Sequence, residues 1–135
     1  MNHFHVLTRD GVRIAFHDVG DGPGVLLIHG WSLSGGEVWD RQIRVLVESG
    51  HRVVAMDLRG GHGNSDAPRA GCHIDSLCDD AIEVIEQRAL DRVALVGWSL
   101  GGLVAMRLAC RRPDLARSLV LVASNGVASA RHETF

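Results

Sequence analysis

The stretch Gly97–Gly102, which reads GWSLGG, follows a short apolar run, Val93–Val96, and opens an Ala- and Leu-rich stretch, Leu100–Arg111. The apolar run predicts a buried strand, and the longer stretch predicts a helix. Between a strand and a helix, G-x-S-x-G is typical of a tight turn that presents a nucleophilic serine. Glycine is needed on both sides because Cβ atoms there would collide. We therefore predict that Ser99 is a strained catalytic nucleophile with an exposed Oγ; a turn that only joins two elements is the alternative.

A second motif, HGW at residues 29–31, directly follows the apolar run Val25–Ile28. Glycine after a buried strand lets the backbone turn close to a ligand. The N–H groups of Trp31 and of Leu100, where the predicted helix begins, are candidate donors to an oxyanion, because the positive end of a helix stabilises negative charge. The Trp31 indole is also a candidate pocket wall. For the His29 side chain we favour a hydrogen-bonded scaffold role.

A third motif, DLRGGHGNS at residues 57–65, follows the apolar strand predicted at Arg52–Met56. Its glycines indicate a tight turn. We expect the turn to be structural, with Asp57 accepting hydrogen bonds from neighbouring backbone N–H groups. His62 is a further candidate because a loop at the carboxyl edge of a sheet lies near the ligand site in open α/β folds.

The rest of the chain alternates short apolar runs with amphipathic stretches. We predict strands at 12–18, 25–28, 52–56, 93–96 and 118–123 and helices at 37–49, 75–89 and 100–111. This order predicts an α/β fold with a mostly parallel sheet and helices on both faces. We expect a single domain over residues 1–135, because this length is enough for one modest core.

Composition narrows the classes of function. The formal net charge is −2, so no basic face is available for nucleic acid or for an anionic membrane. Cys72, Cys78 and Cys110 do not form a disulfide framework or a zinc pattern, and we expect three free thiols and no metal. The first fourteen residues hold no apolar signal-peptide core, and no apolar run approaches the length of a membrane span. The expected location is the cytoplasm.

These motifs together resemble the α/β-hydrolase superfamily over about residues 12–125. HGW, EVW at 37–39, GWSLGGLVA at 97–105 and LVAS at 121–124 resemble the pimeloyl-acyl-carrier-protein methyl ester esterases. Other carboxylesterases and non-haem haloperoxidase-like members share much of this pattern.

The resemblance implies a serine hydrolase that cleaves carboxylic esters through an acyl-enzyme on Ser99. It implies that Trp31 and Leu100 contact the oxyanion and the substrate, and that no cofactor or metal takes part. The expected partner is a small-molecule ester, including one bound to an acyl carrier. Trp31, Trp98 and Leu33 indicate an apolar acyl pocket, and the arginines 107, 111 and 112 are expected on a solvated helix face.

The chain departs from the family pattern in two ways. Gly60-Gly61 and Gly35-Gly36 each look like one added residue, which we expect to lie in loops. The family normally carries its triad acid and histidine on later strands, beyond a lid. The chain is therefore expected to correspond to the N-terminal part of the fold, truncated before the lid and the last strands.

A serine nucleophile needs an adjacent base. After Ser99 the one histidine is His132, beside Glu133. Our hypothesis is that His132 acts as the base, oriented by Asp57, Asp66 or Glu133. Two alternatives remain: a catalytically incompetent fragment or ligand-binding domain, and a haloperoxidase-like perhydrolase that uses peroxide as the acceptor.

If the strands are ordered as in the family, residues 118–123 form an exposed apolar edge strand. Such an edge favours pairing with another chain. We therefore expect homo-oligomers that extend the sheet.

Overall fold

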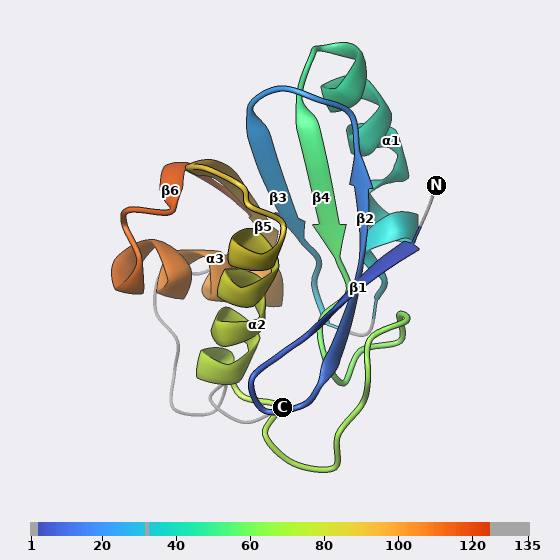
Figure 1. Cartoon of the computed structure of the whole chain (residues 1–135), viewed down its shortest axis with the longest axis vertical. Helices are drawn as coiled ribbons and strands as arrows, with labels where there is room; N and C mark the ends of the chain where they lie inside the picture. The colour runs from blue at the N-terminus through green and yellow to red at the C-terminus, as the bar shows by residue number, and fades with distance from the viewer. Residues whose placement is uncertain (1–2, 32, 125–135) are drawn as a thin grey trace.

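A computed structural model of the chain describes residues 3–31 and 33–124. Strands and helices alternate after an N-terminal pair of strands (Figure 1). The elements are β1 (His3–Leu7), β2 (Arg13–Val19), β3 (Gly24–Ile28), α1 (Gly35–Glu48), β4 (Arg52–Met56), α2 (Ile74–Gln87), β5 (Val93–Trp98), α3 (Leu100–Arg111) and β6 (Ala116–Val122).

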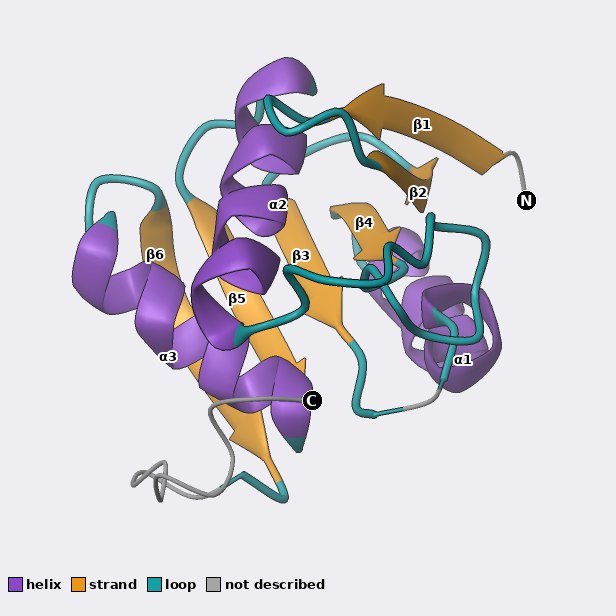
Figure 2. Ribbon diagram, turned by 90° about the horizontal axis from the view of Figure 1, so that it is seen from below, coloured by secondary structure: helices purple, strands orange, loops and turns teal. Residues whose placement is uncertain are grey.

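The strands form one sheet in the order β1-β2-β4-β3-β5-β6. β1 and β2 run antiparallel to their neighbours, whereas β4, β3, β5 and β6 are mutually parallel. α1 covers one face of the sheet, and α2 and α3 cover the other (Figure 2). The predicted α/β fold, mostly parallel and with helices on both faces, is confirmed.

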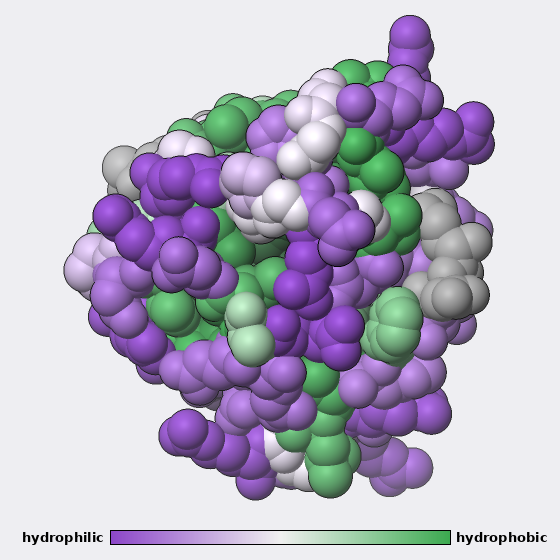
Figure 3. All heavy atoms as spheres, turned by 45° about the horizontal axis from the view of Figure 1, so that its top comes forward, coloured by the Kyte–Doolittle hydropathy of each residue, from purple (hydrophilic) through white to green (hydrophobic). Residues whose placement is uncertain are grey.

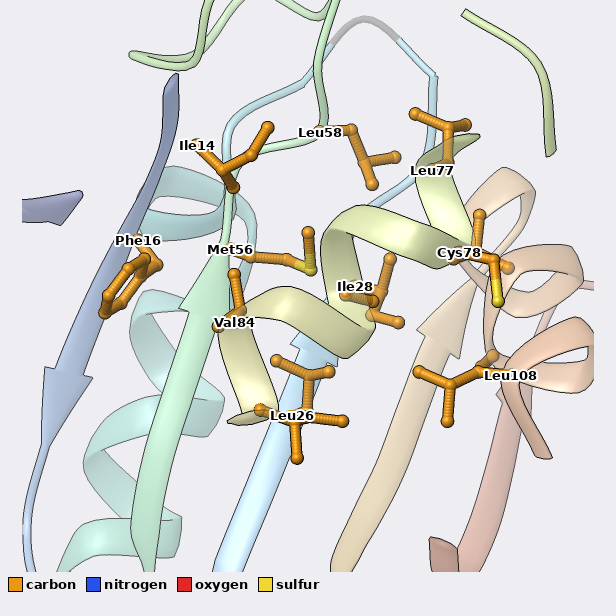
Figure 4. Packing of buried hydrophobic residues seen from close by; sticks show 14 of the residues in the cluster. Ile14, Phe16, Leu26, Ile28, Met56, Leu58, Leu77, Cys78, Val84 and Leu108 are labelled. Atoms are coloured by element: carbon orange, nitrogen blue, oxygen red, sulfur yellow. The ribbon is translucent and has the colours of Figure 1, made fainter. Parts of the chain in front are cut away.

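Apolar side chains fill both sides of the sheet. On the side of α2 and α3, residues from β2, β3, β4 and both helices point toward one another, among them Phe16, Leu26, Met56, Val84 and Leu108 (Figure 4). A smaller cluster on the other side packs α1 against β3 and β4. The fully apolar runs of β3 and β4 are explained by burial on both faces.

The structure differs from the sequence analysis in two local features. β1 was not predicted, and it pairs with β2 over its whole length. Gly35 and Gly36 do not lie in a loop, since they open α1. A Cβ on Gly35 would lie 2.6 Å from the Met56 carbonyl oxygen, so glycine is what allows the helix to start directly against β4.

β6 forms one edge of the sheet, as expected. Its apolar side chains are exposed, from 39% for Leu119 to 48% for Val120. The structure therefore confirms an exposed apolar edge strand. Self-association through that strand stays a prediction.

The face shown in Figure 3 is mostly polar, with apolar patches between the polar side chains. The helices within residues 3–31 and 33–124 are all too short or too polar to cross a bilayer. The three cysteines are free thiols, as predicted, and burial raises the pKa of Cys78 to about 11.

Ion pairs tie α3 to α2 on the surface. Arg107 pairs with Asp75 at 2.7 Å, and Arg111 pairs with Asp79 at 2.8 Å. Arg112 likewise reaches Glu86 at the far end of α2. The three arginines do lie at the surface, but they face acidic groups of the neighbouring helix rather than solvent alone.

Candidate active site

Three loops meet where the central parallel strands end. Ile28 is level with Gly97 of β5 and with Met56 of β4, so the segments that follow all emerge at the same edge of the sheet. Figure 2 views the molecule from this end and shows the loop from β4 to α2 crossing it. The register alone therefore brings the three sequence motifs together.

Ser99 occupies a turn that few non-glycine residues adopt. Its φ is 51° and its ψ is −114°, and it is the residue before α3. Its N–H donates to the Val122 carbonyl at 2.9 Å, and Ser124 Oγ donates to the Ser99 carbonyl at 2.8 Å. The end of β6 thus holds the strained serine in place, while its side chain lies at the surface.

The glycines beside Ser99 are required by close backbone packing. A Cβ on Gly97 would overlap the Gly101 carbonyl, and a Cβ on Gly101 would overlap the carbonyls of Ile28 and His29. The first turn of α3 therefore rests directly on the end of β3. This is the collision predicted from the sequence, with β3 as an additional partner.

The loop after β3 passes close to Ser99. A Cβ on Gly30 would lie 3.4 Å from the Ser99 Cβ. Trp31 and Leu100 line the same pocket, and Trp31 is 54% exposed. Leu100 is the first residue of α3, so its N–H has no acceptor within the helix. The structure thus brings Ser99, Trp31 and Leu100 together.

His29 is a buried scaffold residue, as predicted. Its Nδ1 donates to the Gly30 carbonyl at 2.6 Å, and its Nε2 accepts the Leu58 N–H at 2.9 Å. Burial lowers the pKa of His29, which favours the neutral ring that this arrangement needs. With both ring nitrogens engaged, His29 fixes the loops around the site and is not available as a base.

Asp57 holds a structural turn, as predicted. Its two carboxylate oxygens accept the N–H groups of Gly35 and Asn64 at 2.6 and 2.7 Å. Asp66 is also engaged, because it accepts the Arg13 N–H and pairs with the Arg13 guanidinium. The proposed base His132 and its neighbour Glu133 lie outside the described residues.

Arg59 anchors the loop from β4 to α2, a role that the sequence did not reveal. Its side chain is 2% exposed and binds Asp80 of α2 through two hydrogen bonds, with Nε to Oδ2 at 2.7 Å. It also binds Asp10 at 2.7 Å. Burial raises the pKa of Asp80, and the Arg59 guanidinium opposes that rise. No local pattern could have identified this pair, because the two partners are distant in sequence.

Arg59→Met is expected to reduce the free energy of unfolding by about 3–5 kcal/mol, because it leaves the Asp80 carboxylate buried and unpaired. In that variant the pKa of Asp80 rises in the folded state only. The loss relative to wild type should therefore shrink as the pH falls toward about 6, the pKa of Asp80 in the wild-type fold, because below that pH the Asp80 carboxyl is protonated in both folded proteins. Urea unfolding of Arg59→Met and of Arg59→Met/Asp80→Leu measures this. A loss of under about 1 kcal/mol, or no recovery in the double variant, would contradict the role of Arg59.

A pocket of about 460 Å³ opens between this loop and the starts of α2 and α3. Trp31, Leu58, Leu77 and Leu100 supply apolar walls. The expected acyl-pocket residues Leu33 and Trp98 do not line it, whereas His62 and Ser99 each directly adjoin a lining residue, Gly61 and Leu100. Trp98 instead packs on the face of the sheet that α1 covers, because β5 alternates its side chains between the two faces.

The described parts of the chain bring no three histidine, cysteine or acidic side chains close enough to hold a metal ion. What the site does offer is an accessible hydroxyl at the start of a helix, next to a largely apolar pocket. This arrangement suits attack on an uncharged electrophile such as a carbonyl carbon.

Comparisons with known proteins agree with this geometry. The α/β hydrolase fold family matches residues 23–134. The pimeloyl-acyl-carrier-protein methyl ester esterase of Nitrosomonas europaea is 42% identical over 111 residues, which are 82% of this chain and 41% of that protein. A non-heme chloroperoxidase of Kitasatospora aureofaciens is 41% identical over 70% of this chain and 34% of its own length.

The solved structures lead to the same group of proteins. A bromoperoxidase from Bacillus anthracis superposes with a TM-score of 0.86 at 33% identity and covers 97% of this chain. The match takes in 49% of that protein. The chain therefore spans less than half the length of each of these three proteins.

Proposed function

Because the chain belongs to the α/β hydrolase fold family, we propose that it acts as a serine hydrolase on carboxylic esters, with Ser99 as the nucleophile. The observation that supports the proposal is the backbone of Ser99, which has a φ of 51° at the start of α3, while its side chain is exposed and its neighbour Leu100 lines the pocket. That conformation costs about 1–3 kcal/mol and persists where the surrounding structure enforces it. We take this turn to be a nucleophile elbow.

In the proposed reaction, Ser99 Oγ loses its proton to a base and bonds to the ester carbonyl carbon. The resulting oxyanion accepts hydrogen bonds from the N–H groups of Trp31 and Leu100, helped by the positive end of α3. Collapse expels the alcohol, which takes up the proton and leaves an acyl group on Ser99. Water then attacks the acyl carbon, and the acid departs.

The substrate class follows from the pocket and the relatives. The apolar walls around Trp31 and Leu100 suit the carbon chain of a small ester. One relative is named for an ester carried on an acyl-carrier protein, and an acyl-carrier-bound ester is a proposed substrate of this chain too.

The test is acylation with p-nitrophenyl butyrate, followed by peptide mass spectrometry. We expect nitrophenol release together with a butyryl group on the peptide that contains Ser99. Release that is undiminished in Ser99→Ala would contradict the proposal.

We propose His132 as the base. His132→Ala is then expected to lower the rate of Ser99 acylation by about 10²–10⁴-fold, because a positioned base contributes that much to attack. Stopped-flow measurement of nitrophenol release checks this, and His62→Ala serves as the matched control. An unchanged rate in His132→Ala would exclude this residue as the base.

A second candidate reaction is perhydrolysis, in which peroxide instead of water accepts the acyl group. It is favoured by the likeness to a chloroperoxidase and a bromoperoxidase. Peracid formation from acetate and hydrogen peroxide, lost in Ser99→Ala, would establish it.

A further inference from the structure

The charged side chains among the described residues that line the candidate pocket are all basic. Among the described residues that line it, none is acidic, whereas Arg59, Arg69 and two histidines do line it. Arg59 is neutralised by Asp80 and Asp10 behind the wall. The electrostatics of the pocket therefore depend on Arg69.

Among the described residues, Arg69 has no acidic partner. Its side chain makes no ion pair or hydrogen bond with any residue in the ranges 3–31 and 33–124, although most other arginines there have an acidic partner. It lies at the surface, on the loop from β4 to α2, at a position that lines the pocket. A guanidinium of this kind is a ready partner for a carboxylate, which it binds through two parallel hydrogen bonds.

Two helix starts add to the positive potential. α2 begins at Ile74 and α3 begins at Leu100, and residues from both starts line the same pocket. Each start carries about half a positive charge. The acidic residue in the first turn of α2, Asp75, is paired with Arg107 and does not line the pocket.

We propose that this pocket selects esters that carry a carboxylate in addition to the scissile ester, with Arg69 as the residue that binds it. The apolar walls hold the carbon chain between the two ends. This proposal rests on the proposed function, because that function is what makes the pocket a substrate-binding site. It adds a specificity residue that the sequence motifs do not contain.

Binding can be measured without turnover in a Ser99→Ala host. The two probes are monomethyl glutarate and the same molecule with its carboxylate replaced by a primary amide. Nuclear magnetic resonance titration of the Trp31 indole N–H reports occupancy of the pocket. We expect the carboxylate to bind about tenfold more tightly than the amide, which corresponds to one charge-assisted contact of about 1.4 kcal/mol.

The matched pair of variants is Arg69→Gln and Arg41→Gln. Arg41 is an exposed arginine on α1 that does not line the pocket, so both variants remove one surface charge. Arg69→Gln should abolish the preference for the carboxylate, and Arg41→Gln should retain it. Equal binding of the two probes, or a preference that survives in Arg69→Gln, would overturn the proposal. This outcome is separable from failure of the proposed function, because the measurement needs no reaction at Ser99.

Discussion

Gly101→Ala is expected to cost at least about 3 kcal/mol of folding free energy. The new Cβ would overlap the carbonyl groups of Ile28 and His29. Both are backbone atoms of the central strand β3 and its extension, so no side-chain rotation can relieve the collision. The start of α3 would have to move away from the sheet, and Ser99 would move with it. Urea unfolding followed by circular dichroism measures the loss.

Gly11→Ala is the matched control. Gly11 has a φ of 79°, but a Cβ there would meet nothing within 4 Å. Its cost should be that of an unfavourable φ alone, about 1–2 kcal/mol. If Gly101→Ala lost no more than Gly11→Ala, the close approach of α3 to β3 would not constrain the fold, and our account of the turn would be wrong.

Ser99→Ala is expected to lower ester hydrolysis by at least about 10³-fold while the chain stays folded, because it removes the attacking oxygen. Ser99→Gly should lose the reaction equally. The two variants should differ in stability, because glycine adopts the φ of 51° at this position without the strain of a Cβ. We expect Ser99→Gly to be more stable than Ser99→Ala by about 1 kcal/mol.

Activity and unfolding of the same two preparations check both parts. Hydrolysis that persists in Ser99→Ala would show that another residue is the nucleophile. Equal stability of the two variants would show that the turn at Ser99 is not strained.

The sequence predicted the central part of the fold well, because each prediction rested on a local signal. GWSLGG between an apolar run and a helix specified the turn at Ser99, and the parallel strands on either side followed from the alternation of elements. The sequence did not predict β1, because this strand is only five residues long. It has two apolar side chains on one face, Phe4 and Val6, which is too short an alternation to identify a strand. The start of α1 was predicted to be a loop, because two consecutive glycines normally indicate one.

The sequence predicted those residues of the candidate site that belong to a local motif. Ser99, Trp31 and Leu100 were predicted to meet at the ends of their strands, and the register of β3 with β5 brings them there. The sequence did not predict three other features of the site. These are the ion pair of Arg59 with Asp80, the hydrogen bond from Ser124 to the Ser99 carbonyl, and the position of Arg69 at the pocket. These contacts join residues far apart in the sequence, or depend on which loop covers the pocket, and neither property has a local pattern.

The alternative to the hydrolase proposal is that the pocket binds a ligand without chemistry. That reading and the hydrolase proposal share the fold, the pocket and the positive potential around Arg69. They differ in one property, the reactivity of the Ser99 hydroxyl.

That reactivity is measured most directly by labelling the purified chain with a fluorophosphonate and mapping the adduct by mass spectrometry, with circular dichroism to verify the fold. The account predicts one adduct per chain, on Ser99, and none in Ser99→Ala. A folded chain that stays unlabelled at Ser99 would contradict the proposed nucleophile and leave ligand binding as the function of the pocket.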